Sequence, residues 1–283
     1  GIKLEGEDPH MVDLLAKLTK WDPMFNFNKE DALGQKKFSV PTTCKKVLCA
    51  AESIFGKAKA LKMLYALDKY EINMSSLTDK NLASWKSSEI DIILEAVDDL
   101  PSHLVPFNKN QSLKHYKRGY GPSSSTVANA VITVFSVWED NLDNDQERMS
   151  ALIHEIGHNI GHRLDQDESP EWLDISGWEQ KEDVWTPSLK DQVVSKYGLT
   201  NPAEDFAETF VAFRYNPQLL KKMSPKKYNY MRDKVFSGLE YDSAEKCKDK
   251  NSNFTKLLNE IKIKDAPPPN NFGLCEAEIE QIL

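Results

Sequence analysis

Apolar residues recur at helical spacing in two parts of the first third of the chain. Between Val40 and Tyr70 they repeat with the helical period, which predicts helix over that stretch. A second helix is predicted from Ser88 to Leu100, with Ser87 as its N-cap and Pro101 just beyond its end. The segment 71–84 between them is polar and rich in turn residues. The pattern therefore predicts a helical N-terminal region that ends at this segment.

The period of the pattern changes in the middle of the chain. Val127–Trp138 is dense in β-branched residues and predicts a strand. We expect this strand at a sheet edge, where an extended peptide could pair with it, although a core strand without substrate contact fits the same residues. Asn144 and Asp145 then predict the start of a helix that runs through Leu164. The last third is predicted to be helical with polar breaks, and 266–271 to be an extended linker to a short amphipathic tail.

The predicted helix at 144–164 carries two histidines that can bind one metal ion. His154 and His158 stand at positions i and i+4, so their side chains project from one face of the helix. Glu155 between them can lie beside the open position of such a metal and act as a general base. The H-E-x-x-H pattern is therefore typical of a zinc hydrolase.

Two further features of this helix favour a metal site. Its main apolar face does not include the histidines, so neither belongs to the principal packing surface. That face comprises Met149, Leu152, Ile153, Ile156, Ile160 and Leu164. Gly157 and Gly161 each cost about 1 kcal/mol relative to alanine in a helix interior. We therefore expect another backbone, or the site itself, to approach the helix closely at these glycines.

A catalytic zinc site needs a third protein ligand. In the metzincin pattern H-E-x-x-H-x-x-G-x-x-H this ligand is a histidine, but the position holds Leu164, and Asp165 comes one residue too late. His162 lies more than one helical pitch from His154, which is too far to share one ion. We interpret His162 as a surface residue, in preference to a substrate contact or a neighbour of the ligands. A metzincin site is therefore not expected.

A glutamate from a later helix can complete the site instead. Asn201 predicts an N-cap, Pro202 takes the first helical position, and Glu204 falls where it can close a capping box. Capping alone would explain Glu204. However, Glu204 and Glu208 form a like-charge pair one turn apart, which a cation would relieve. We therefore predict that Glu204 is the third zinc ligand and that Glu208 hydrogen-bonds a ligand histidine.

Composition narrows the class of protein. The chain has 283 residues and a formal net charge of −8. This charge argues against nucleic-acid binding as the main task, because phosphate neutralisation needs a basic surface. No apolar run approaches the roughly 18 residues of a membrane-spanning helix, so no membrane span is predicted.

The cysteines and the first residues bear on the compartment. The four cysteines are Cys44, Cys49, Cys247 and Cys275, and their spacings fit no zinc knuckle. Free thiols of a cytosolic protein would fit, but the even count slightly favours disulfides and an oxidising compartment. The opening Gly1–Met11 resembles an expression-tag remnant, and we expect that a native leader was removed. The protein is therefore expected to be secreted or periplasmic.

The segment Tyr197–Phe210 resembles a known family. Its Tyr-Gly-x-Thr-Asn-x-Ala-Glu-x-Phe-Ala-Glu-x-Phe pattern looks like the second motif in the catalytic domain of the anthrax lethal factor family. It is also similar to the corresponding segment of the related Pro-Pro endopeptidases, and both groups are gluzincins with H-E-x-x-H. The resemblance extends over about Ile90–Tyr215. It implies a zincin catalytic domain with one Zn²⁺ per chain, bound by His154, His158 and Glu204.

The resemblance also implies roles for three residues around the metal. Glu155 would be the general base and acid, Tyr197 would stabilise the oxyanion, and Glu208 would hydrogen-bond a ligand. The alternative for Tyr197 is an aromatic residue that packs before a helix. The mechanism implied is metal-assisted hydrolysis of a peptide bond.

These features together predict an α+β fold in four parts. They are a tag remnant (1–11), a helical N-terminal region (12–84), a zincin-type catalytic domain with a small mixed sheet and active-site helices (85–250), and a C-terminal linker with a short helical tail (251–283).

The predicted function is that of a bacterial zinc endopeptidase with a protein or peptide substrate; the oligomeric state is not predicted. One alternative is a binding or adhesion protein on a zincin scaffold, against which Glu155 argues, because a closed structural zinc site needs no base. The other is a zinc amidase that acts on cell-wall peptide.

Overall fold

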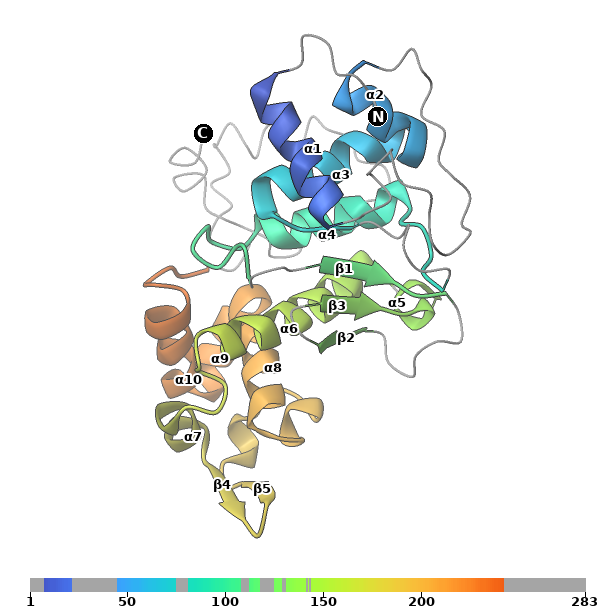
Figure 1. Ribbon diagram of the computed structural model, residues 1–283. Helices are drawn as coiled ribbons and strands as arrows, with labels where there is room; N and C mark the ends of the chain where they lie inside the picture. The colour runs from blue at the N-terminus through green and yellow to red at the C-terminus, as the bar shows by residue number, and fades with distance from the viewer. Residues whose placement is uncertain are drawn as a thin grey trace, which may run out of the picture. The chain divides into compact units, whose positions relative to one another are not determined.

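The chain divides into two compact units, with the boundary between Glu155 and Ile156. This boundary falls inside one continuous helix, α6 (Asp145–Arg163). The part of the chain that the structure describes consists of helices and two small sheets, so the predicted α+β class is confirmed (Figure 1). The predicted domain limits at residues 84 and 250 remain predictions. The computed structural model describes residues 8–21, 45–74, 81–107, 112–117, 125–128, 131–140, 142 and 144–241.

Among the described residues, four helices precede the first strand. They are α1 (Pro9–Trp21), α2 (Val47–Phe55), α3 (Lys57–Tyr70) and α4 (Ser87–Asp98). The helical stretch predicted between Val40 and Tyr70 is therefore two helices, and Gly56 separates them. Gly56 has φ +83°, a conformation that glycine adopts without the strain a Cβ would cause. Its N–H donates to the Glu52 carbonyl over 2.9 Å, which closes α2.

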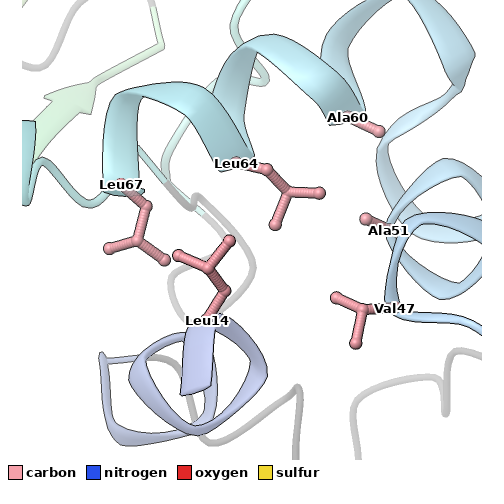
Figure 2. Close-up of a cluster of buried hydrophobic side chains, with 6 residues drawn as sticks. All are labelled: Leu14, Val47, Ala51, Ala60, Leu64 and Leu67. Carbon is pink, nitrogen blue, oxygen red and sulfur yellow. The ribbon is translucent and has the colours of Figure 1, made fainter. Parts of the chain in front are cut away.

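A small apolar cluster joins the first three helices (Figure 2). Its members are Leu14 of α1, Val47 and Ala51 of α2, and Ala60, Leu64 and Leu67 of α3. All six are buried, and full burial of one leucine contributes roughly 1.5–3 kcal/mol. Burial of one face of each helix in this cluster accounts for the helical spacing of apolar residues in the sequence of this region.

The first turn of α1 contains Pro9, His10 and Met11, which the sequence assigned to a tag remnant. Met11 packs against the apolar cluster of Figure 2. The His10 Nε2 atom lies 3.0 Å from a carboxylate oxygen of Asp68 on α3. These residues therefore take part in the fold of the N-terminal unit.

Cys49 on α2 is disulfide-bonded. The expectation of disulfides in place of free thiols is therefore confirmed for this cysteine. Cys44, Cys247 and Cys275 lie outside the described residues.

The start of α4 differs from the prediction by one residue. Ser87 is the first helical residue, and Lys86 is the N-cap. The Lys86 backbone N–H donates to the Glu89 carboxylate over 2.6 Å, so Glu89 satisfies a backbone group at the helix start. This contact fixes the Glu89 side chain at the beginning of α4.

The strand predicted at Val127–Trp138 is wrong as a single element. Its residues belong to the end of β2, to all of β3 and to the start of α5. Ala128 pairs with Val131, so the chain reverses between β2 and β3, and a run of β-branched residues does not reveal such a reversal. The elements are β1 (Ser112–His115), β2 (Ser125–Ala128), β3 (Val131–Val134) and α5 (Ser136–Asp140).

The three strands form one sheet in the order β1-β3-β2. β3 runs parallel to β1 and antiparallel to β2. The strand β2 is therefore an outer strand of this sheet, while β3 lies in its centre. The strand predicted at Val127–Trp138 was expected at a sheet edge, and of its two observed strands only β2 has that position.

Helix α6 follows the prediction closely. The Asn144 Oδ1 atom accepts a hydrogen bond from the Glu147 N–H over 3.0 Å, as expected for an N-cap. The helix ends at Arg163, one residue before the predicted end. Its apolar face is buried except for Leu164, which is half-buried. Within the described part of the chain, no helix combines the length and apolarity needed to cross a bilayer.

As far as residue 241, the C-terminal unit is a group of helices with one β-hairpin (Figure 1). Its core contains several fully buried aromatic rings, among them Trp172, Phe206, Phe210, Phe213 and Phe236. The predicted linker and tail lie outside the described residues. The elements are α7 (Pro170–Ser176), β4 (Trp178–Lys181), β5 (Val184–Pro187), the 3₁₀ segments η2 (Lys190–Gln192) and η3 (Tyr197–Leu199), α8 (Pro202–Tyr215), α9 (Pro217–Met223), α10 (Pro225–Tyr230) and the π-helical η4 (Met231–Val235).

Candidate active site

The two histidines of the H-E-x-x-H pattern lie one turn apart on α6. His154 is buried, and His158 is partly buried with a side-chain exposure of 16%. Because both belong to one continuous helix, their side chains share a face. The helix alone therefore supplies two nitrogen ligands for a metal.

The two glycines of α6 allow α8 to approach closely. A Cβ atom at Gly157 would lie 3.3 Å from both the Ala207 Cα and the Phe210 Cβ. A Cβ atom at Gly161 would lie 3.0 Å from the Phe206 ring. The expected close approach of another backbone is therefore confirmed, and the approaching element is the helix that carries Glu204.

The start of α8 is built as the sequence predicted. The Asn201 Oδ1 atom accepts a hydrogen bond from the Glu204 N–H over 2.9 Å, and Pro202 occupies the first helical position. The Glu204 side chain extends toward α6, where its Oε2 atom lies 3.1 Å from the His158 Nε2 atom. The cap therefore fixes the backbone of Glu204, while its carboxylate lies beside a histidine of α6.

Ligand atoms of His154, His158 and Glu204 all lie within 4.8 Å of one another. Zinc bonds of about 2.0–2.1 Å in tetrahedral geometry place neighbouring ligand atoms roughly 3.3 Å apart, close to the His158–Glu204 distance. Two imidazoles and one carboxylate are also a donor set typical of catalytic zinc. The three predicted ligands therefore fit one zinc ion. His162 and Asp165 are exposed, and this group includes neither of them.

Glu155 is buried and hydrogen-bonded to the N-terminal sheet. The Ser125 Oγ atom of β2 donates to the Glu155 Oε1 atom over 2.9 Å. A hydrogen bond to a charged group contributes about 1.5–3 kcal/mol, so this contact orients the carboxylate. The sequence did not single out Ser125, because it ends a serine-rich run that reads as a turn.

Tyr197 lies in η3, just before α8, and the residue is 56% exposed. Its hydroxyl donates to the Glu204 Oε1 atom over 3.2 Å. The Thr200 hydroxyl donates to the Tyr197 carbonyl over 2.7 Å and holds the short turn. The 56% exposure of Tyr197 argues against the alternative that this tyrosine is a packing residue. Its hydroxyl instead lies at the predicted ligand cluster.

A buried ion pair anchors α8 next to Glu204. The Lys227 Nζ atom lies 2.7 and 2.6 Å from the two Asp205 carboxylate oxygens, and both side chains have 0% exposure. Trp178 Nε1 donates to Asp205 over 2.9 Å, and Lys227 also donates to the Gln192 carbonyl over 3.1 Å. The pair therefore ties α8, α10, the β4–β5 hairpin and the 3₁₀ segment η2 together.

Burial dominates the protonation equilibria of this pair. It raises the pKa of Asp205 and lowers the pKa of Lys227, while each partner opposes the shift of the other. Sequence reasoning missed the pair, since Asp205 and Lys227 are far apart in the chain and neither carries a motif.

Glu208 lies one turn after Glu204 on α8 and is half-buried. It is thus on the same side of α8 as Glu204, as its spacing predicts. Its hydrogen bond to a ligand histidine remains a prediction.

One of the comparisons with known proteins identifies a family for this chain. The family described as anthrax toxin lethal factor, N- and C-terminal domain, matches residues 34–234, which is more than half of the chain. The match extends well before Ile90, where the resemblance found in the sequence motifs began. Neither a curated protein nor a solved structure gave a significant match. The chain therefore belongs to the anthrax toxin lethal factor family, a family of zinc metalloproteases.

Proposed function

We propose that this chain is a zinc-dependent endopeptidase of the gluzincin type that hydrolyses peptide bonds in a protein or peptide substrate. The observation that carries the proposal is the position of Glu204, which α8 brings to the two histidines of α6. A carboxylate ligand from a later helix is the feature that separates this site from a metzincin site. Membership of a zinc metalloprotease family supports the same conclusion.

In this proposal His154, His158 and Glu204 hold the zinc. The bound ion supplies Lewis acidity, which lowers the pKa of water to about 7 and polarises a carbonyl group. Glu155 accepts the proton of the attacking water and returns it to the leaving amine. The Ser125 hydroxyl keeps the Glu155 carboxylate oriented for both transfers. Glu208 hydrogen-bonds a ligand histidine and so orients its ring.

Tyr197 stabilises the negative charge that develops on the carbonyl oxygen. Its exposed side chain and the hydrogen bond from its hydroxyl to Glu204, one of the proposed ligands, support this role. Such a donor acts chiefly in the transition state, where the charge is largest.

Two other functions are compatible with parts of the site. A binding protein with structural zinc would need no base, so the buried, hydrogen-bonded Glu155 favours an enzyme. A zinc amidase that cleaves cell-wall peptide would use the same residues. Incubation with casein and with peptidoglycan, each with and without a chelator, separates the three functions, and chelator-sensitive cleavage of casein is the expected result.

We further propose that the protein acts outside the cytoplasm of a bacterium. The disulfide at Cys49 supports an oxidising compartment, because such bonds are rare in the cytosol.

The zinc content of ligand variants tests the gluzincin assignment. The purified protein should hold about one zinc per chain at this site. Glu204→Ala and His158→Ala should each lose this zinc, because a site with three protein ligands loses most of its affinity for zinc when one ligand is removed. Elemental analysis after dialysis against metal-free buffer measures the content. His162→Ala is the matched control, since His162 is exposed on the same helix and should leave the content unchanged. Full occupancy of this site in Glu204→Ala would refute the assignment.

Steady-state kinetics of Tyr197→Phe tests the oxyanion role. We expect kcat to fall by roughly 10- to 1,000-fold with little change in KM, because the hydrogen bond strengthens in the transition state. Tyr65→Phe is a suitable control, since Tyr65 is also an exposed tyrosine but belongs to α3. If kcat stays unchanged in Tyr197→Phe while Tyr197→Ala raises KM, the ring contacts substrate and the hydroxyl has no catalytic role.

A further inference from the structure

A second group of metal-ligating side chains lies in the N-terminal unit. Glu89 of α4, His115 of β1 and Glu139 of α5 have ligand atoms that all lie within 4.8 Å of one another. All three residues come from different elements of the same compact unit. None of them belongs to the candidate active site.

The imidazole of His115 lies between the two carboxylates. Its Nδ1 atom is 3.7 Å from the Glu89 Oε2 atom, and its Nε2 atom is 3.8 Å from the Glu139 Oε2 atom. Both separations exceed hydrogen-bond length. They start from different ring nitrogens, so one ion would bond a single nitrogen of His115 together with the two carboxylates. The Trp85 ring, whose centroid is 5.1 Å from that of His115, supports the imidazole from one face. The geometry is therefore set by packing before any ligand binds.

One oxygen of Glu89 has no hydrogen bond, and it lies 3.8 Å from the Lys86 ammonium that contacts Glu139. The Oε1 atom is buried and accepts none from the part of the chain that the structure describes. The other oxygen accepts the Lys86 backbone N–H. The Glu89 side chain is only 6% exposed, and a buried carboxylate oxygen that accepts no hydrogen bond is costly. This oxygen is therefore a ligand atom available to a cation.

Lys86 shows that the group attracts a cation. Its ammonium contacts the Glu139 carboxylate and lies 3.8 Å from the Glu89 Oε1 atom. The Lys86 side chain is 61% exposed, so its ammonium can leave the group for water. One lysine supplies a single positive charge for two carboxylates, whereas a divalent ion would match both.

We propose that Glu89, His115 and Glu139 form a second metal site, which takes a divalent transition-metal ion of the zinc class. An imidazole nitrogen among the ligands favours such an ion over Mg²⁺ or Ca²⁺, which prefer oxygen ligands only. Binding displaces Lys86 into solvent and joins α4, β1 and α5 through one ion. Because Lys86 competes for the same carboxylates, the site fills when zinc is added and empties on dialysis against metal-free buffer. It uses no residue of the proposed catalytic centre.

Zinc binding to the Glu204→Ala variant isolates this second site. We expect this variant to bind about one added zinc per chain with the first site removed, and the zinc to raise its Tm by mass action. The double variant Glu139→Gln/Glu204→Ala should bind none and show no rise in Tm. Glu139 is partly exposed, so its replacement should leave the fold intact, which circular dichroism checks. Glu95→Gln/Glu204→Ala is the matched control, because Glu95 is an exposed glutamate of α4.

The variant Lys86→Met tests whether the two carboxylates bind a metal ion or only the Lys86 ammonium. In the Glu204→Ala background, removal of the competing ammonium should tighten zinc binding several-fold in a calorimetric titration. The decisive comparison is between Glu204→Ala and Glu139→Gln/Glu204→Ala. If these two variants bind the same amount of zinc, Glu139 holds no metal and the proposal is refuted. Loss of zinc from the first site does not affect this outcome, because both variants lack that site.

Discussion

Glu155→Gln should retain zinc and fold but lose peptide hydrolysis by about 10²–10⁴-fold, the range that a general base contributes. Glutamine keeps the size of glutamate and retains an oxygen that can accept the Ser125 hydroxyl. It cannot accept the proton of an attacking water at neutral pH. The loss should therefore appear in kcat, while KM and the zinc content stay near wild type.

The measurement combines kcat on a peptide substrate with elemental analysis of the same preparation. Glu147→Gln is the matched control, because Glu147 is an exposed glutamate on the same helix and should leave kcat unchanged. Activity near wild type in Glu155→Gln would mean that another group takes the proton. Loss of zinc together with activity would mean that Glu155 acts in metal binding, and the assigned role would be wrong.

The parts of the site that could be predicted from sequence are those that local rules determine. His154 and His158 share a face because helical periodicity fixes it, and the cap at Asn201 follows from residues within one turn. The two glycines of α6 were visible as unfavourable helix residues. Their reason became clear only with α8 packed against them.

The elements that were predicted incorrectly are those in which one composition fits two structures. The β-branched run at Val127–Trp138 fits one long strand as well as two short antiparallel strands and a helix start. Pairing energy between residues such as Ala128 and Val131 decides between them, and no local pattern encodes it. Gly56 similarly separates two helices whose apolar spacing continues across the break.

The contacts that could not be predicted join residues far apart in the chain. Ser125 contacts Glu155 across 30 positions, and Lys227 contacts Asp205 across 22. Such pairs arise from tertiary packing, which brings together side chains that carry no motif of their own. The group around His115 has the same origin, because its three side chains come from different elements.

Lys227→Met should destabilise the fold by about 3–5 kcal/mol, because it leaves the Asp205 carboxylate buried without its cation. Both side chains have 0% exposure, so water cannot replace the lost ammonium without a change in packing. The Gln192 carbonyl also loses its donor. Urea unfolding followed by circular dichroism measures the free energy of unfolding.

Two further variants separate the charge from the packing. Lys226→Met is the matched control, since Lys226 is the exposed neighbour on α10 and should change stability by at most about 0.5 kcal/mol. Asp205→Asn/Lys227→Met removes both charges and keeps an oxygen for the Trp178 N–H, so it should recover much of the lost stability. A double variant no more stable than Lys227→Met would show that the loss comes from packing. Asp205 adjoins the proposed ligand Glu204 on α8. If Asp205→Asn/Lys227→Met regains stability and binds zinc fully, the charges of the pair are not needed for zinc binding. The pair would then act on Glu204 only by holding α8 in position.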